Sequence, residues 1–146
     1  RNGDLYIGKN GYIGKYGTYL DDATTYRFAY YTNNADLGNP NQISVLKTIS
    51  AIVIGGSNQF LTIKWGFDYS GSYQAQNVFI PTQASYEYGV AEYNVADYNA
   101  GIAIKTLKAS ASGAGKIVQT GYEATINSVS FSLQKIEIQA KNGKLA

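Results

Sequence analysis

The stretch QFLTIKWGFD, residues 59–68, decides the fold of this chain. Its large apolar side chains occupy every second position, at Leu61, Ile63, Trp65 and Phe67, and the intervening residues are Thr, Lys and Gly. A period of two indicates an extended strand with one buried face and one solvent-facing face. We therefore expect an antiparallel strand here, with Trp65 in the core rather than on a binding surface.

Apolar runs of similar length recur along the chain and are separated by turn residues. We expect further strands at 26–32, 43–54, 78–80, 102–109, 116–126 and 129–140. The glycine-rich segments 55–58 and 110–115 are interpreted as turns, because neither precedes a helix as a phosphate-binding loop would. Near Gln134 and Lys135 the apolar positions change phase, which predicts a β-bulge. No apolar stripe has the helical period over three turns, so we expect no long helix.

Strands with two distinct faces must bury one of them against a second sheet. The sequence therefore predicts an all-β fold, an antiparallel β-sandwich of jelly-roll type, over residues 20–146. Residues 1–19 are predicted to form a separate β-hairpin, because Asn10-Gly11 between two short apolar runs favours a type I′ turn. The chain begins with Arg1 instead of Met, so we expect a fragment or a processed product.

Composition limits the chemistry that the chain can perform. Its 146 residues include no Cys, no His and no Met. Without Cys and His there is no disulfide, zinc ribbon, Ser-His-Asp triad or Cys-His pair. A glycosidase needs only two carboxylates, but the pairs Asp21-Asp22 and Glu92-Asp97 lie beside turns, where acids usually accept backbone hydrogen bonds. We expect no enzymatic activity, no cofactor and no metal.

Charge and hydropathy argue against two classes of partner. Twelve Lys and Arg residues stand against ten Asp and Glu, and the basic residues are scattered instead of forming a stripe for nucleic acid. The longest apolar run, Ile49–Ile54, is too short to span a bilayer, and no signal peptide is evident. We expect a soluble chain without a sequence-specific nucleic-acid partner or a membrane span.

An acidic residue followed by tyrosine recurs every five residues in one segment. The candidate interface or binding residues are Glu87, Tyr88, Glu92, Tyr93, Asp97 and Tyr98. A period of five fits neither helix nor strand, so we expect a wound loop that presents the tyrosines in sequence. Such tyrosines could bind a partner protein or a sugar, and the acids could gather a hard cation. The alternative is a loop that only packs on its own sandwich.

Several stretches taken together resemble one group of phage proteins. The segment DLYIGKNGYIGKY at 4–16 resembles the end of a β-propeller blade. The segments YRFAYYT at 26–32, IKWGFDY at 63–69, AEYNVADY at 91–98 and FSLQKIEI at 131–138 resemble the domain that follows the propeller. The group is the nozzle or packaged-DNA-stabilisation tail proteins of double-stranded DNA bacteriophages.

The resemblance implies a structural virion protein in the tail nozzle or tail hub. It implies a ring of identical subunits that contacts fibres and other tail or portal-adaptor proteins and helps to retain packaged DNA. It also implies that residues 1–19 are the end of an upstream propeller blade. The alternative is a carbohydrate-binding β-sandwich module for receptor or glycan recognition, because 14 tyrosines exceed the need of the core and exposed tyrosines suit either role.

Overall fold

The computed structural model describes residues 5–9, 11–16, 24–38, 41–82 and 104–143. These residues form β-strands and turns, and none of them belongs to a helix. The predicted all-β fold is therefore confirmed. Consistent with this, the described part of the chain has no helix long and apolar enough to cross a membrane.

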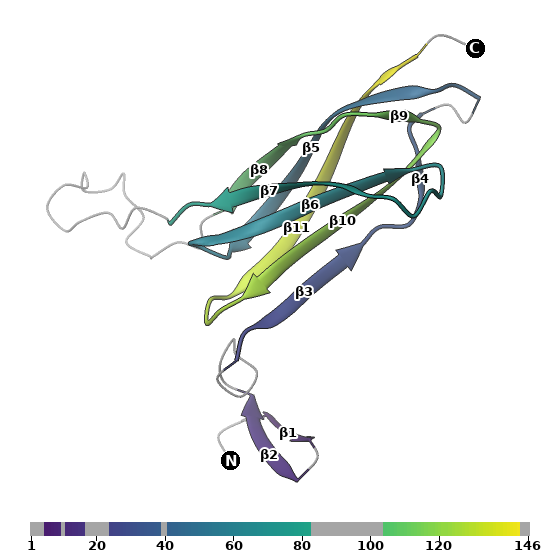
Figure 1. Ribbon diagram of the computed structural model, residues 1–146. Coiled ribbons are helices and arrows are strands. Elements are labelled where there is room, and N and C mark those ends of the chain that lie inside the picture. The colour runs from purple at the N-terminus through teal and green to yellow at the C-terminus, as the bar shows by residue number, and fades with distance from the viewer. Residues whose placement is uncertain (1–4, 10, 17–23, 39–40, 83–103, 144–146) are drawn as a thin grey trace, which may run out of the picture.

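Two antiparallel sheets form the sandwich (Figure 1), as predicted. The larger sheet has the strand order β3-β10-β6-β7, made of Tyr26–Tyr31, Ile117–Ile126, Gln59–Phe67 and Gln74–Ile80, and the short β4 (Ala35–Asp36) also pairs with β10. The smaller sheet has the order β11-β5-β8, made of Phe131–Asn142, Ser44–Gly55 and Ile104–Ser110, and β9 (Ala114–Gly115) also pairs with β5.

Most successive strands of more than two residues alternate between the two sheets, the exception being β6 and β7, which are neighbours in the larger sheet. The chain runs from β3 in the larger sheet to β5 in the smaller one, then through β6 and β7, back to β8, across to β10 and finally to β11. This interleaving is that of a jelly roll, which usually has about eight strands in two sheets. Among the described residues, and apart from the two-residue strands, the larger sheet has four strands and the smaller sheet three. The described part of the smaller sheet is thus one strand short of this arrangement.

The core lies between the sheets and is built from alternate residues of each strand. In β6, Leu61, Ile63 and Trp65 are buried, and the residues between them face outward. The indole Nε1 of Trp65 donates a hydrogen bond to the backbone carbonyl of Ser112 at 2.8 Å, which satisfies its only polar group. The predictions of a half-buried strand and of a core tryptophan are both confirmed.

The predicted turn at 55–58 and the predicted bulge are also present. Gly55 has a positive φ of 77°, and a Cβ there would lie 2.1 Å from the carbonyl oxygen of Ser130, so only glycine fits. In β11 the register on β5 shifts between Leu133 and Lys135. Gln134 is the extra residue, and the shift keeps the apolar side chains on the core side after the bulge.

Some strand boundaries differ from the prediction. β7 begins at Gln74 and not at Val78. The sequence pattern does not reveal its first four residues as strand, because they are polar or small and show no apolar alternation. β4 lies between the strands expected at 26–32 and 43–54, and β9 lies in the segment 110–115, which is expected to be a turn. They pair through backbone groups alone, which a hydrophobic pattern does not reveal.

Strands β1 (Leu5–Lys9) and β2 (Tyr12–Tyr16) form a hairpin of their own. Lys9 pairs with Tyr12, so two residues connect the strands as expected, and Gly11 has a φ of 84°. The hairpin lies beyond the end of β3 and pairs with no strand of the sandwich (Figure 1).

Candidate recognition face

The larger sheet has a face that points away from the core, which we call the outer face. The strand register places Ala29, Glu123, Thr62 and Asn77 in one row across four strands. The next row contains Tyr31, Gly121, Lys64 and Ala75. Polar side chains therefore meet near the middle of the sheet, and the small residues beside them leave space above the backbone.

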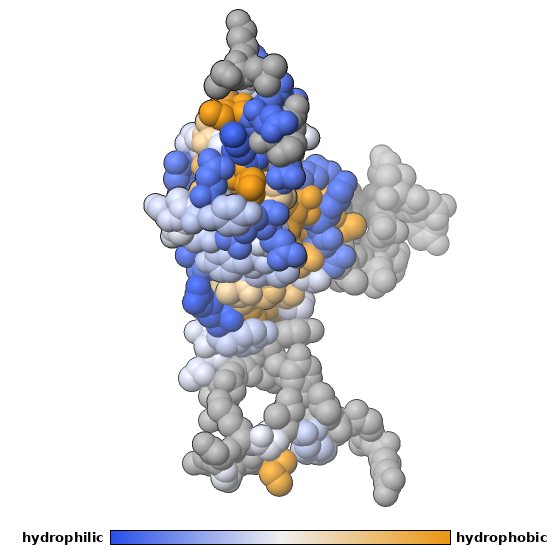
Figure 2. Space-filling model, turned by 90° about the vertical axis from the view of Figure 1, so that its right-hand side faces the viewer, coloured by the Kyte–Doolittle hydropathy of each residue, from blue (hydrophilic) through white to orange (hydrophobic). Residues whose placement is uncertain are grey.

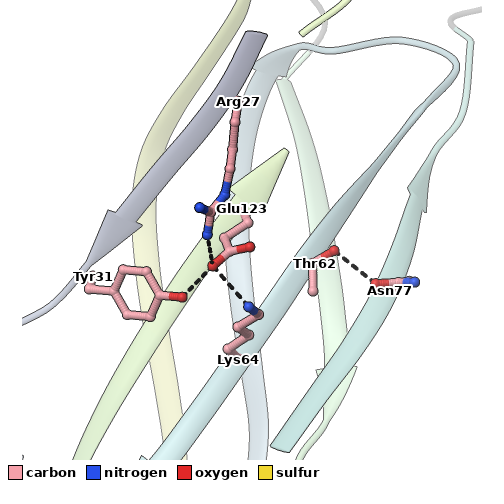
Figure 3. A network of polar contacts seen from close by, with 6 residues as sticks. All are labelled: Arg27, Tyr31, Thr62, Lys64, Asn77 and Glu123. Carbon is pink, nitrogen blue, oxygen red and sulfur yellow. Dashed lines mark hydrogen bonds and ion pairs between the residues drawn. The ribbon is translucent and has the colours of Figure 1, made fainter. Parts of the chain in front are cut away.

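Glu123 is the centre of a polar cluster on this face (Figure 3). Its Oε1 atom accepts hydrogen bonds from Arg27 Nη2 at 2.6 Å and Lys64 Nζ at 2.9 Å, and from the hydroxyl of Tyr31. These donors come from β3 on one side and β6 on the other. The hydrogen bonds from Tyr31 and Lys64, together with Arg27, lower the pKa of Glu123 from 4.5 to about 2.

The low pKa decides what Glu123 can do. Its carboxyl group is ionised at neutral pH, so it accepts hydrogen bonds and cannot act as a general acid. Glu123 is the one carboxylate among the residues drawn in Figure 3, and hydrolysis of a glycosidic bond would need a pair. Elsewhere in the described part of the chain, no three acidic side chains gather in a way that would hold a metal ion. This arrangement can bind and orient a ligand.

Two tyrosines lie against glycines of the outer face. A Cβ at Gly121 would lie 2.4 Å from Cε1 of Tyr31, and one at Gly66 would lie 3.2 Å from Cδ1 of Tyr73. The two rings meet edge to face with centroids 5.7 Å apart. The hydroxyl of Tyr31 donates to Glu123, and that of Tyr73 donates to Gln119. The glycines thus hold both rings close to the sheet.

The other end of the face combines an aromatic pair with a hollow. Phe60 and Phe79 pair across β6 and β7 with ring centroids 5.2 Å apart, and both are exposed. Thr62 donates to Asn77 at 2.8 Å beside them. A hollow of about 400 Å³ lies over this end. Its lining is Thr25, Arg27, Gln59, Phe60, Thr62, Glu123, Ala124, Thr125 and Asn127.

A second hollow, of about 430 Å³, lies between β3 and β11. These strands are edge strands of the two sheets and come together on the same side of the sandwich. Phe28 and Phe131 form the floor, with ring centroids 5.1 Å apart. The rim includes Tyr30, Leu133 and Ile136. We call this hollow the edge groove.

The residues predicted from sequence as interface candidates are Glu87, Tyr88, Glu92, Tyr93, Asp97 and Tyr98, and they lie outside the described residues. The outer face was not foreseen from the sequence. Its central residues, Arg27, Lys64 and Glu123, come from distant parts of the chain, and only strand pairing brings them together. One local signal was available, since Lys64 and Gly66 occupy the outward phase of the strand that decides the fold.

No family model matches the sequence, and neither a curated protein nor a solved structure matches it.

Proposed function

We propose that this chain is a structural, non-catalytic domain of a bacteriophage tail, in the nozzle or tail hub. It contacts other copies of itself in a ring and other tail or portal-adaptor proteins, and it helps to retain packaged DNA. The resemblance of its motifs to tail proteins supports the location. One structural observation supports the assembly role, namely the open side of the smaller sheet beside β11.

In the described part of the chain, the smaller sheet lacks a strand on the outer side of β11. At the opposite side of the sandwich, β7 and β8 lie close together and close the gap between the sheets. On the β11 side, β5 is the one described strand that pairs with β11, and the edge groove exposes an apolar floor beneath its rim. An unpaired edge over an apolar floor is suited to a contact with another protein.

The occupant that we propose for the edge groove is a neighbouring copy. The lining of the groove mixes apolar side chains with Ser132, Gln134 and Lys135. On the face that Figure 2 shows, hydrophobic patches are likewise separated by hydrophilic residues. Contacts between copies would therefore combine a small apolar centre with a polar rim, as in many interfaces that are not permanently closed. Tyr30 at the rim is 47% exposed and offers a large contact area for little loss of conformational entropy.

The mass of the purified chain tests this proposal. We expect native mass spectrometry and light scattering to detect oligomers, and we expect Tyr30→Arg to shift them toward monomer. Tyr26→Arg is the matched control, because Tyr26 lies on the same strand, is 40% exposed and does not line the edge groove. A strictly monomeric chain that also has no place in an assembled tail particle would overturn the proposal.

The second candidate function is carbohydrate binding, as a receptor-contacting module. The outer face favours it, because exposed aromatic rings and fixed polar groups occur there together. A glycan array probed with the wild-type chain and with Phe60→Ala tests it. A reproducible sugar signal that the substitution abolishes supports this function, and the absence of any signal favours assembly alone. Tyr93→Ala tests separately whether the acid-Tyr repeat contributes.

A further inference from the structure

We propose that the outer face binds an oligosaccharide bearing carboxylate groups, with the chain of sugar rings lying along β6. This inference rests on the second candidate function and assigns it a surface and a ligand class. Four features of the outer face support it: a hollow lined by hydrogen-bonding groups, a carboxylate held in place by hydrogen bonds, exposed aromatic rings at both ends of the face, and an excess of positive charge.

The lining of the hollow suits a hydroxyl-rich ligand. It contains the side chains of Thr25, Thr125 and Asn127, which can donate as well as accept hydrogen bonds, and the hydroxyl of Thr62, which donates to Asn77 and can still accept. Gln59 also belongs to the lining. It lies on the core-facing phase of β6 with Leu61, and its side-chain amide is buried, so it is not counted among the groups that meet the ligand.

The central carboxylate is positioned before any ligand arrives. All three donors reach Oε1 of Glu123, and none of the residues drawn in Figure 3 contacts Oε2. Glu123 is therefore fixed by β3 and β6 while Oε2 can accept a sugar hydroxyl. The guanidinium of Arg27 belongs to a side chain that is 65% exposed, which leaves donors for a ligand carboxylate.

Aromatic rings mark the two ends of a strip along β6. Phe60 and Phe79 lie at one end, and Tyr31 and Tyr73 at the other, where Tyr73 covers Gly66. From Phe60 to Gly66 the strand rises about 20 Å, which is enough for several sugar rings in a row. Exposed aromatic rings can pack against the apolar C–H faces of sugars, and the polar middle of the strip can bond their hydroxyl groups.

The charge of the face selects among sugars. In the central cluster the cations Arg27 and Lys64 face the single anion Glu123, so one positive charge remains. A neutral sugar chain would leave that charge uncompensated, and a carboxylate placed at Arg27 would pair with it. The face therefore favours an acidic saccharide, such as a polyuronate, over a neutral one.

Titration of the full 146-residue chain tests this inference. The probes are tetragalacturonate, the neutral cellotetraose, and an oligoglutamate peptide that is acidic but has no sugar rings. We expect calorimetry to detect tetragalacturonate binding, and amide NMR shifts to concentrate on β3, β6 and β10. Phe60→Ala and Arg27→Gln should each weaken binding about tenfold. High salt should weaken the binding of tetragalacturonate to the wild-type chain, because part of the attraction is electrostatic.

Ile104→Ala is the control, because Ile104 is exposed on β8 of the other sheet. Its affinity should equal that of the wild type, and melting temperatures should show that all variants fold. Equal binding of cellotetraose or oligoglutamate, no loss of affinity in Arg27→Gln, or no binding of any probe at millimolar concentration would each overturn the inference. The mass measurements on Tyr30→Arg do not depend on these results, so failure of one proposal is distinguishable from failure of the other.

Discussion

At the scale of single residues, the central feature is Glu123, whose Oε1 atom accepts hydrogen bonds from three side chains. It is the acceptor for two cations and a phenol, and its own side chain is only 14% exposed. The same interactions raise the pKa values of Arg27, Lys64 and Tyr31, in each case through the hydrogen bond with Glu123 first. The cluster therefore joins three strands through one oxygen atom.

Glu123→Gln should reduce the stability of the fold in a pH-dependent way. At neutral pH we expect a loss of roughly 1 kcal/mol in the free energy of unfolding, because a charged acceptor is replaced by a neutral one. The folded pKa of Glu123, about 2, lies below its usual value of 4.5, so the stabilisation is complete above pH 4.5 and disappears as the pH falls toward 2.

Urea unfolding of both proteins between pH 7 and pH 2 measures this difference. Glu137→Gln is the control, because the ion-pair partner of Glu137 is the exposed Lys135, at 2.6 Å, and this pair should contribute less. A difference between wild type and Glu123→Gln that stays constant over the pH range would contradict the assignment.

At the scale of strands, the alternation of apolar and polar residues predicts most of the strands and turns. Neighbouring residues are enough to predict three features: the strand at 59–68, the glycine turn after β5 and the bulge at Gln134. The outer face was missed because its contacts depend on register between strands that are far apart in sequence. Gly121, for example, has a role only because strand pairing sets it opposite Tyr31.

Gly121→Ala tests that role. The new Cβ would meet the ring of Tyr31 at 2.4 Å, so the ring must move away from Glu123, and we expect a loss of about 1–3 kcal/mol. In a Tyr31→Ala background the same substitution should cost almost nothing, because the obstructing ring is gone. Thermal unfolding of the four proteins gives the coupling energy.

Gly8→Ala serves as the comparison, since a Cβ at Gly8 meets no atom within 4 Å. It should leave the melting temperature unchanged. Additive effects of Gly121→Ala and Tyr31→Ala would show that the glycine is not required to hold the ring against the sheet.

At the scale of the whole molecule, the hairpin and the sandwich are separate sheets. No strand of the sandwich pairs with β1 or β2, and a two-stranded hairpin alone is marginally stable in water. The sandwich contains the buried core, from Leu46 in β5 to Ile126 in β10. The division into residues 1–19 and 20–146 stays a prediction, and truncation tests it.

Removal of residues 1–19 should leave a sandwich that unfolds cooperatively, with a melting temperature within a few degrees of that of the full chain. Calorimetry of the two forms measures this. A truncated protein that loses its cooperative transition would show that the hairpin is part of the folding unit.

The pairing of the last strand with a middle one has a consequence for synthesis. β11, which ends at Asn142, pairs with β5, and β3 pairs with β10, so the larger sheet cannot be completed before β10 has left the ribosome, nor the smaller sheet before β11 has. Until then the apolar faces of β5 and β6 have no permanent cover and are prone to aggregation. Such distant pairings also slow folding, because long loops must close before their contacts form. Nascent chains that end before β10 should therefore depend on chaperones.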